Sequence, residues 1–213
     1  RLQMKDPVLA VRGRRLGCTS YLAGAVGVDG LVELMGGRDA FIGKLDSLFT
    51  ADSKLEGEST SVDISGLIGQ YAHGNEPSHH IAHLYNYVGQ PWRTQEIVDE
   101  VLHTLYFNNP DGLSGNEDCG QMSAWYILNA MGFYQVCPGK PVYSIGRPLF
   151  NEATVHLKDG KSFKVIAHNN SRDNKYVQSI VLNGNKLETP FFTHQDIVDG
   201  GTLELTMGSE PLK

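Results

Sequence analysis

The stretch Gly115-Asn-Glu-Asp-Cys-Gly-Gln-Met-Ser-Ala-Trp125 places carboxylates and amides in a glycine-containing loop directly ahead of an apolar segment. Residues 123–131 have the composition of an apolar helix, and Gly132 follows them where helices commonly end. A second stretch, His73-Gly-Asn-Glu-Pro-Ser-His-His80, has the same layout. The sequence therefore predicts two loop-to-helix junctions that carry acidic side chains.

The chain before residue 140 is predicted to be mainly helical, because its apolar residues recur at helical spacing over residues 29–131. Two helices come first, residues 50–64 are a polar loop, and two further helices that meet near Gly89 and Pro91 form a helical hairpin. The apolar positions that define these four helices are Leu31, Leu34, Met35, Phe41, Leu45, Leu48, Phe49, Ile81, Leu84, Tyr85, Val88, Ile97, Val98, Val101, Leu102 and Leu105.

After residue 140 the apolar residues alternate in short runs that are separated by Asp-Gly, Asn-Gly and Gly-Gly turns. The strongest hairpin signal is Lys158-Asp-Gly-Lys161, and a second turn is predicted at Asn183-Gly184. The predicted strands cover residues 153–157, 162–167, 176–182 and 203–207.

The predicted fold class is therefore α+β, in three segments. Residues 1–28 are a basic N-terminal segment, residues 29–140 are the helical part, and residues 141–213 are a small antiparallel β-sheet or sandwich unit. Few polar groups converge in the last segment, so its expected role is packing.

Composition excludes two classes of partner. The formal net charge of the 213 residues is -6 and no long run of lysine or arginine occurs after residue 15, so we expect no nucleic acid as the main partner. No apolar stretch reaches the roughly 18 to 20 residues that would span a bilayer. Residues 1–15 are basic and lack the apolar region of a secretory signal.

The two polar stretches carry the chemistry. Glu117 and Asp118 are adjacent, and the positive end of the following helix favours an ionised acid, which suits a general base. Glu76 lies directly before Pro77, at another helix entry. Two carboxyl groups in different environments are what glycoside hydrolysis requires. The alternative is that these acids simply cap the helices that follow them.

Histidine spacing offers a competing interpretation. His79 and His83 are four residues apart and so share one helix face, a spacing that can bind zinc, which makes a zinc hydrolase a rival. The sequence contains no HExxH string and no third ligand at a diagnostic distance, so it does not support a zinc site further. The other interpretation is that these histidines are hydrogen-bonded within a polar pocket. For Trp92 and Trp125, a place in the core is favoured over stacking against a sugar ring.

Three cysteines, Cys18, Cys119 and Cys137, form neither a paired framework nor a CxxC pair. Isolated thiols are the expected state, and a disulfide between Cys119 and Cys137 stays open on sequence alone.

Six motifs occur in order along the chain: Leu31-Val-Glu-Leu-Met-Gly-Gly37, Gly74-Asn-Glu-Pro-Ser-His-His80, Tyr85-Asn-Tyr-Val-Gly-Gln-Pro-Trp92, Gly112-Leu-Ser-Gly-Asn-Glu-Asp-Cys-Gly-Gln-Met-Ser-Ala-Trp-Tyr126, Gly132-Phe-Tyr-Gln-Val-Cys-Pro-Gly139 and Gly200-Gly-Thr-Leu-Glu-Leu-Thr-Met-Gly208. Together they resemble the C-terminal part of glycoside hydrolase family 92, the bacterial exo-acting α-mannosidases. The resemblance covers residues from about 29 to 211.

The resemblance implies that residues 29–140 are the helical part of an (α/α)6 catalytic barrel that is joined to a β-sandwich. It also implies a calcium ion that binds the 2- and 3-hydroxyls of mannose, which suits a site rich in oxygen ligands. The implied activity is the inverting hydrolysis of terminal α-linked mannose in mannose-containing glycans, similar to that of an α-1,2-mannosidase. The implied location is periplasmic or extracellular.

The resemblance also assigns roles to residues. Asp118 matches the general base, and Asn116 stands where many members carry a second acid. The residues expected to contact the sugar are Asn75, Glu76, Glu117 and His79. The calcium ligands are not assigned to individual residues.

One departure concerns the general acid. Ala23 stands where the resemblance would place the glutamate that protonates the leaving oxygen, and residues 25–28 are too few for the aromatic segment that usually follows it. The sequence therefore predicts a fragment or truncated homologue of such an enzyme. The second hypothesis is a non-catalytic carbohydrate-binding or partner-dependent remnant. An incomplete barrel is expected to self-associate or to need a partner chain that covers its apolar faces.

Overall fold

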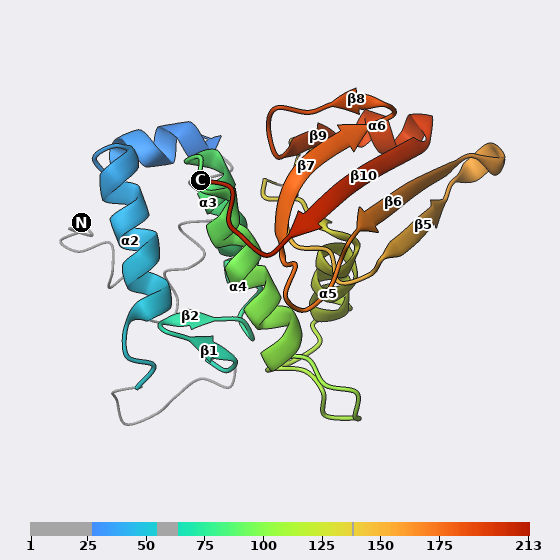
Figure 1. Cartoon of the computed structure of the whole chain (residues 1–213). Coiled ribbons are helices and arrows are strands. Elements are labelled where there is room, and N and C mark those ends of the chain that lie inside the picture. Colours follow the sequence, from blue (N-terminus) through green and yellow to red (C-terminus); the bar gives the residue numbers. More distant parts are fainter. Residues whose placement is uncertain (1–26, 55–63, 138) are drawn as a thin grey trace.

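The computed structural model describes residues 27–54, 64–137 and 139–213 (Figure 1). Helices α2, α3 and α4 lie on one side of the molecule with the short strands β1 and β2, and strands β5 to β10 lie on the other side with α5 and α6 (Figure 1). Helix α4 lies between α2 and strands β7 and β10 (Figure 1). The predicted α+β class, with a helical part followed by β-sheets, is confirmed. Within the described residues, no helix is both long and apolar enough to cross a membrane.

The helical part follows the predicted order. Residues 27–34 are helical, and α2 (Arg38–Thr50), α4 (Pro91–Thr104) and α5 (Gln121–Met131) follow. Helix α4 begins with a proline. Proline has no backbone N–H, but the N–H at this position has no partner within a helix, so nothing is lost. Helix α2 buries the four apolar positions that its sequence pattern indicated, Phe41, Leu45, Leu48 and Phe49. An apolar stripe at helical spacing is therefore enough to locate these helices.

The predicted helix over residues 81–88 differs in detail. The chain there forms two 3₁₀ turns, η2 (Glu76–Ser78) and η3 (Ile81–His83), and the one-turn helix α3 (Leu84–Tyr87). Every residue over 78–86 is buried, so side chains face protein on all sides. A single apolar stripe cannot describe such a segment, and short 3₁₀ pieces let the chain turn more tightly than one α-helix would.

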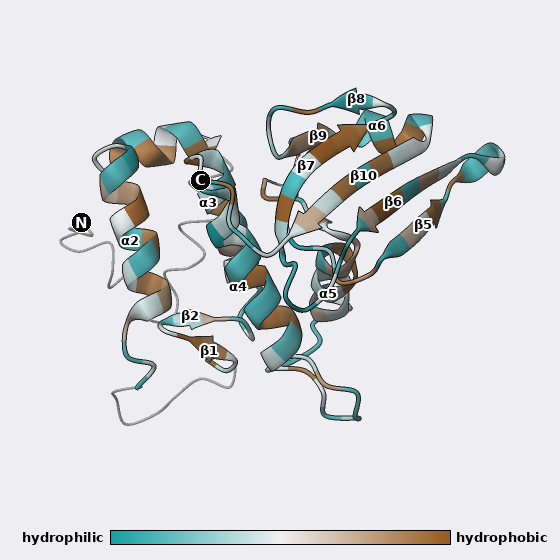
Figure 2. Ribbon diagram, viewed as in Figure 1, coloured by the Kyte–Doolittle hydropathy of each residue, from teal (hydrophilic) through white to brown (hydrophobic). Residues whose placement is uncertain are grey.

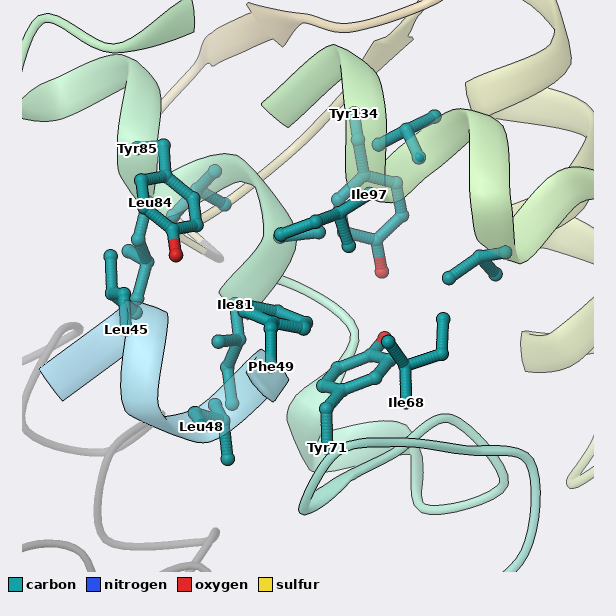
Figure 3. Packing of buried hydrophobic residues seen from close by; sticks show 14 of the residues in the cluster. Leu45, Leu48, Phe49, Ile68, Tyr71, Ile81, Leu84, Tyr85, Ile97 and Tyr134 are labelled. Carbon is teal, nitrogen blue, oxygen red and sulfur yellow. The ribbon is translucent and has the colours of Figure 1, made fainter. Parts of the chain in front are cut away.

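The core of the helical part is built from α2, η3, α3, α4, the short strands β1 (Leu67–Ile68) and β2 (Tyr71–Ala72), and Tyr134. Figure 3 shows side chains from these elements pointing toward one another. The residues labelled there are Leu45, Leu48, Phe49, Ile68, Tyr71, Ile81, Leu84, Tyr85, Ile97 and Tyr134. Trp125 of α5 belongs to the same cluster and is fully buried, so its predicted place in the core is confirmed.

A five-stranded sheet forms most of the β part. Its strand order is β5 (Glu152–His156), β6 (Ser162–His168), β10 (Gly201–Gly208), β7 (Tyr176–Leu182) and β8 (Asn185–Lys186). The predicted hairpin of β5 and β6 is confirmed, with the single 3₁₀ turn η4 (Lys158–Gly160) at its tip. The second predicted turn joins β7 to β8, where Asn183 and Gly184 both have positive φ, as a two-residue hairpin requires.

This sheet is mixed, whereas the sequence predicted an antiparallel one. Strand β10 pairs with β7 in antiparallel fashion and with β6 in parallel fashion. Strands β6 and β7 run in opposite directions and leave a gap one strand wide, so the strand that fills this gap must be parallel to one of them. Turn signals describe only neighbours in sequence, and β10 pairs across longer separations.

A second sheet of three strands, β3 (Phe133–Tyr134), β4 (Val142–Ile145) and β9 (Phe191–Thr193), packs against the first. The Phe163 and Phe192 rings stack across the two sheets with their centres 5.8 Å apart. Helix α6 (His194–Asp199) connects β9 to β10. The inner strands β7 and β10 are largely hydrophobic, while the tip of the β5–β6 hairpin is hydrophilic (Figure 2). Two packed sheets give the predicted sandwich-like unit.

Polar side chains connect the helical part to the β part. Arg147, which is 2% exposed, lies with its Nε 2.8 Å from the Asp99 carboxylate of α4. The Gln95 side-chain oxygen accepts a hydrogen bond from the Val177 backbone, and the Tyr176 hydroxyl donates to Glu96. These contacts hold α4 against β7, so the two parts form one body.

Candidate active site

Both predicted loop-to-helix junctions open into one pocket. The pocket has a volume of about 720 Å³ and takes its walls from η2, α5 and the segment after β3. Glu76 comes from the first junction and Asp118 from the second. The other lining residues are Pro77, His79, His80, Gln121, Ala124, Leu128, Tyr134, Gln135 and Val136. Two carboxylates distant in sequence therefore share one cavity.

The two loops are held together by their glycines. A Cβ on Gly115 would lie 2.9 Å from the Gly74 carbonyl oxygen, and a Cβ on Gly74 would lie 3.0 Å from the Ser114 carbonyl oxygen and overlap Ser65. Gly115 also has a φ of +78°, which side-chain-bearing residues rarely adopt. Only glycine allows the two backbones to approach this closely, so these residues fix the distance between the two acidic loops.

Asp118 lies in a strained turn directly before α5. Asp118 and Cys119 have φ of 45° and 56°, and Gly120 follows at 91°, so three successive residues are left-handed. For residues with a Cβ, this conformation costs about 1 to 3 kcal/mol each. The turn leaves the Asp118 side chain exposed at the pocket and next to the positive end of α5. Cys119 is exposed and Cys137 is buried, and the two form no disulfide with each other, which settles the pairing that the sequence left open.

Glu117 and Asn116 do not join Asp118 in the pocket. The Glu117 carboxylate accepts hydrogen bonds from the backbone N–H of Ser123, at 3.0 Å, and from the Ser123 hydroxyl, at 2.9 Å. Glu117 therefore caps α5, as the alternative interpretation of this motif proposed. Asn116 is exposed and lies outside the residues that line the pocket.

Asn75 supports the first loop. Its backbone carbonyl accepts hydrogen bonds from the N–H and the hydroxyl of Ser78, which close the η2 turn. Its side chain is half-buried and is not among the pocket-lining groups. Of the residues predicted to act on the sugar, the structure thus brings Glu76, His79 and Asp118 to the pocket, and places Asn75, Asn116 and Glu117 beside it.

His79 lines the pocket, yet both of its ring nitrogens face protein groups. Nε2 lies 3.0 Å from the His73 carbonyl oxygen, so it carries a hydrogen and donates. Nδ1 lies 3.1 Å from the Gln121 side-chain nitrogen, so it accepts. This pattern requires the neutral ring, and burial lowers the pKa of His79 to about 4.

His73, which the sequence did not single out as a site residue, is fully buried behind His79. Its ring nitrogens pair with the Tyr71 hydroxyl at 2.9 Å and the Tyr106 hydroxyl at 2.7 Å. The His73 and His79 rings stack with their centres 4.7 Å apart, and burial holds the pKa of His73 well below its usual range. His73 therefore supports the pocket wall without reaching the pocket.

The zinc interpretation is not supported by this arrangement. His83 is fully buried, with Nε2 2.8 Å from the Asn129 side-chain oxygen and Nδ1 3.1 Å from the Ser144 hydroxyl. All four ring nitrogens of His79 and His83 are thus engaged by protein groups. Within the described part of the chain, no three His, Cys, Asp or Glu side chains gather as metal ligands.

The same observation limits a calcium site. Calcium takes six to eight oxygen ligands, and Glu76 and Asp118 are the two carboxylates that line the pocket. A calcium ion held there would need further oxygen ligands from amide side chains, backbone carbonyls or water. Ala23, the residue that raised doubt about the general acid, lies outside the described residues.

Gln121 and Tyr134 are pocket residues that the sequence analysis missed. The Gln121 side-chain nitrogen donates to His79 and to the Tyr134 hydroxyl, each at 3.1 Å. Gln121 stands at the first position of a helix, where a polar residue is ordinary, and Tyr134 lies in a short strand. Neither position carries a local pattern that indicates a site.

Chemically, the pocket combines an exposed carboxylate on a strained turn, a second carboxylate from the other acidic loop, neutral imidazoles, and the apolar side chains of α5. An exposed carboxylate can accept a proton from water, and the mixed wall suits a ligand with both hydroxyl groups and apolar faces.

Comparison with known proteins gives a consistent result. Residues 23–209 match the profile of the glycosyl hydrolase family 92 catalytic domain. The structure of the family GH92 alpha-mannosidase BT3965 from Bacteroides thetaiotaomicron in complex with mannoimidazole is similar, with 41% sequence identity and a TM-score of 0.84. The similarity covers 93% of this chain and 26% of that one.

The family GH92 inverting mannosidase BT2199 from Bacteroides thetaiotaomicron VPI-5482 is also 41% identical, with a TM-score of 0.78 over 94% of this chain and 28% of that chain. An uncharacterized secreted glycosidase from Arthroderma benhamiae is 31% identical over 183 residues, which are 84% of this chain and 21% of the relative. The chain thus spans about a quarter of the length of its solved relatives and about a fifth of the curated one.

Proposed function

Because the chain belongs to glycosyl hydrolase family 92, we propose that it forms the base-bearing part of an α-mannosidase that hydrolyses terminal α-linked mannose with inversion. The observation that supports this most strongly is the shared pocket of Glu76 and Asp118. Two loops that are 40 or so residues apart in sequence meet there because Gly74 and Gly115 pack backbone to backbone. Solved relatives with 41% identity are described as mannosidases, which supports the same substrate class.

In this proposal Asp118 is the general base. Its carboxylate would take a proton from the water that attacks the anomeric carbon, and an inverting enzyme leaves room for that water between sugar and base. The strained turn supports this role, because it holds an exposed carboxylate at the pocket and next to the positive end of α5. Asn116 lies two residues before this base, and we propose that it does not contact the sugar.

Sugar recognition is proposed for Glu76 and His79, which line the pocket. Glu76 would accept hydrogen bonds from sugar hydroxyls. The neutral His79 ring would form part of the pocket wall, because both of its nitrogens already bond to protein groups. Asn75 would act by shaping the η2 turn, and Glu117 by capping α5. A mannose-containing glycan outside the cytoplasm, in the periplasm or beyond the cell, is the proposed substrate, which agrees with the secreted glycosidase among the relatives.

Calcium dependence is part of the proposal, and the ligands would be oxygen atoms around the pocket that Glu76 and Asp118 line. The test is calorimetric titration of calcium into the 213-residue chain with and without methyl α-mannoside. Calcium that binds equally with and without the sugar would contradict a metal that contacts sugar hydroxyls.

The second candidate is a carbohydrate-binding remnant, favoured by Ala23 at the position expected for the general acid. Without an acid that protonates the leaving oxygen, hydrolysis would be about 10² to 10⁴ slower. An aryl α-mannoside, whose leaving group needs little protonation, separates the two candidates. Turnover that requires Asp118 supports the enzyme, whereas calorimetric binding of methyl α-mannoside without turnover supports the remnant.

The decisive variant is Asp118→Asn, which keeps the size of the side chain and removes its basicity. We expect aryl mannoside hydrolysis to fall by about 10² to 10⁴ while methyl α-mannoside binding is kept. Asp111→Asn, in the exposed loop before the site, is the matched control. Hydrolysis unaffected by Asp118→Asn would refute the assigned mechanism.

A further inference from the structure

Gln121 has an orientation that its neighbours determine completely. Because His79 Nε2 donates to the His73 carbonyl, the neutral His79 ring can only accept at Nδ1. The group of Gln121 that faces Nδ1 must therefore be the amide nitrogen, which lies 3.1 Å away. The same nitrogen lies 3.1 Å from the Tyr134 hydroxyl oxygen, so each of its two hydrogens has an acceptor.

Two pKa shifts follow from this arrangement. The hydrogen bond from Gln121 lowers the pKa of Tyr134 against the larger rise that burial causes, as a bond donated to the phenolic oxygen should. Burial also lowers the pKa of His79 to about 4, so its Nδ1 carries no hydrogen at neutral pH. A reversed amide would bring its oxygen against the lone pair of Nδ1.

With both amide hydrogens committed, the side-chain oxygen Oε1 is the remaining polar atom of Gln121. Within the described residues it makes no hydrogen bond, and Gln121 is one of the residues that line the pocket beside Asp118. Gln121 is half-buried and its Oε1 is not among the fully buried atoms that lack a partner, so this oriented acceptor is open to a ligand hydroxyl that enters the pocket.

We propose that Gln121 is a sugar-binding residue whose Oε1 accepts a hydrogen bond from one hydroxyl of the bound glycosyl group, and that His79 is the positioning residue that points Oε1 into the pocket. This rests on the proposed function for the nature of the ligand. The orientation itself follows from the His73, His79, Gln121 and Tyr134 hydrogen bonds.

Two variants of Gln121 separate its two roles. Gln121→Met removes the acceptor, so methyl α-mannoside should bind about tenfold more weakly. Gln121→Glu keeps an acceptor toward the pocket but can no longer donate to His79, so His79 must itself be protonated to pair with it. We expect Gln121→Glu to retain sugar binding and to raise the pKa of His79 above its wild-type value.

The sugar hydroxyl is identified with monodeoxy analogues of methyl α-mannoside. In the wild type, removal of one particular hydroxyl should weaken binding about tenfold, and in Gln121→Met the same removal should have no effect, because the bond is already lost. Gln178→Met is the matched control: the Gln178 amide donates to the Tyr176 and Glu210 carbonyls in the β part, away from the pocket.

The position of the hydrogen on the His79 ring is measured separately by nitrogen NMR of the imidazole. The wild type should show hydrogen at Nε2 only, and this readout needs no ligand. Hydrogen at Nδ1 in the wild type would overturn the orientation. Wild-type binding that Gln121→Met leaves unchanged would overturn the sugar contact and leave the proposed function standing, whereas no mannoside binding by the wild type would overturn both.

Discussion

At the scale of single residues, burial keeps the histidines of the site neutral. Burial lowers the pKa of His79, His80 and His83 to about 4 in the folded chain, compared with 6.5 for an exposed imidazole. A group whose folded pKa is depressed stabilises the fold above its unfolded pKa, and that stability is lost as pH falls toward the folded pKa.

The first prediction follows from this sign. Between pH 7 and pH 5 the unfolded chain binds protons at these histidines, while the folded chain does not. The free energy of unfolding should therefore be about 2 kcal/mol lower at pH 5 than at pH 7 for each of the three histidines. Urea denaturation at the two pH values measures the loss. His83→Gln should flatten the pH dependence, and His156→Asn, at an exposed position on β5, should not. Equal stability at both pH values would contradict the buried, neutral state.

The second prediction concerns the contact between the two acidic loops. Gly74→Ala should destabilise the fold by about 1 to 3 kcal/mol, because its Cβ would overlap Ser65 and press on Ser114. It should also weaken mannoside binding, since the loops would move apart. Gly43→Ala is the control: no atom lies within 4 Å of the new Cβ in α2, so this change should stabilise by up to about 1 kcal/mol. Thermal unfolding compares the two.

At the scale of elements, the start of α5 has two functions that adjacent residues divide between them. Glu117 satisfies the exposed N–H of Ser123, and Asp118 faces the pocket. The third prediction is that Glu117→Ala lowers stability by about 1 kcal/mol without changing affinity for methyl α-mannoside. Ser123→Ala, which removes only the hydroxyl partner, should cost less. A fall in sugar affinity for Glu117→Ala would instead support the sugar contact that the family resemblance implied.

Helices and hairpins were predictable here because their signals are local. The apolar stripe of α2 and the turns at Asp159 and Asn183 depend only on neighbouring residues. The 3₁₀ turns between Glu76 and His83 were not predictable, since buried surroundings on every side leave no stripe. The parallel pairing of β10 with β6 was hidden for a related reason, because tertiary contacts alone decide it.

The candidate site divides in the same way. Glu76 and Asp118 were found from their loop-to-helix setting, and the structure places both in the pocket. Glu117 has the same setting but is used as a cap, and no sequence rule decides which of two adjacent acids faces a cavity. Gln121 and Tyr134 acquire their places only through hydrogen bonds to each other and to His79, which lies 42 residues from Gln121.

At the scale of the whole molecule, one buried ion pair joins the helical part to the β part. The fourth prediction is that Asp99→Leu or Arg147→Met destabilises the chain by about 3 to 5 kcal/mol. The first leaves the buried Arg147 without its carboxylate, and the second leaves Asp99 with only His103 and the more distant, exposed Arg172. The double variant Asp99→Leu with Arg147→Met should cost less than the sum, and a double-mutant cycle by urea denaturation measures the difference. Additive losses would show that the pair does not couple the two parts.

The fifth prediction concerns association. Leu34 is 70% exposed on the first helix and Ile127 is 49% exposed on α5, whose sequence is apolar nearly all round. A helix of this kind is normally covered, so we expect the chain to self-associate or to bind a partner chain over these faces. Sedimentation velocity over a range of concentrations should show mass rising with concentration, and Ile127→Glu should reduce it. A constant monomer mass would contradict this expectation.

The position of β10 in the sheet has a consequence for synthesis of the chain. The ribosome makes β10 after the other four strands of its sheet, yet β10 is the middle strand of the five and supplies the fully buried Leu203 and Leu205. Until residue 208 leaves the exit tunnel, β6 and β7 each present a bare edge, a state that invites wrong pairing between nascent chains. The helices can assemble before β10 is made, whereas the sheet is complete only when β10 has left the exit tunnel, and a chaperone that shields strand edges would act in that interval.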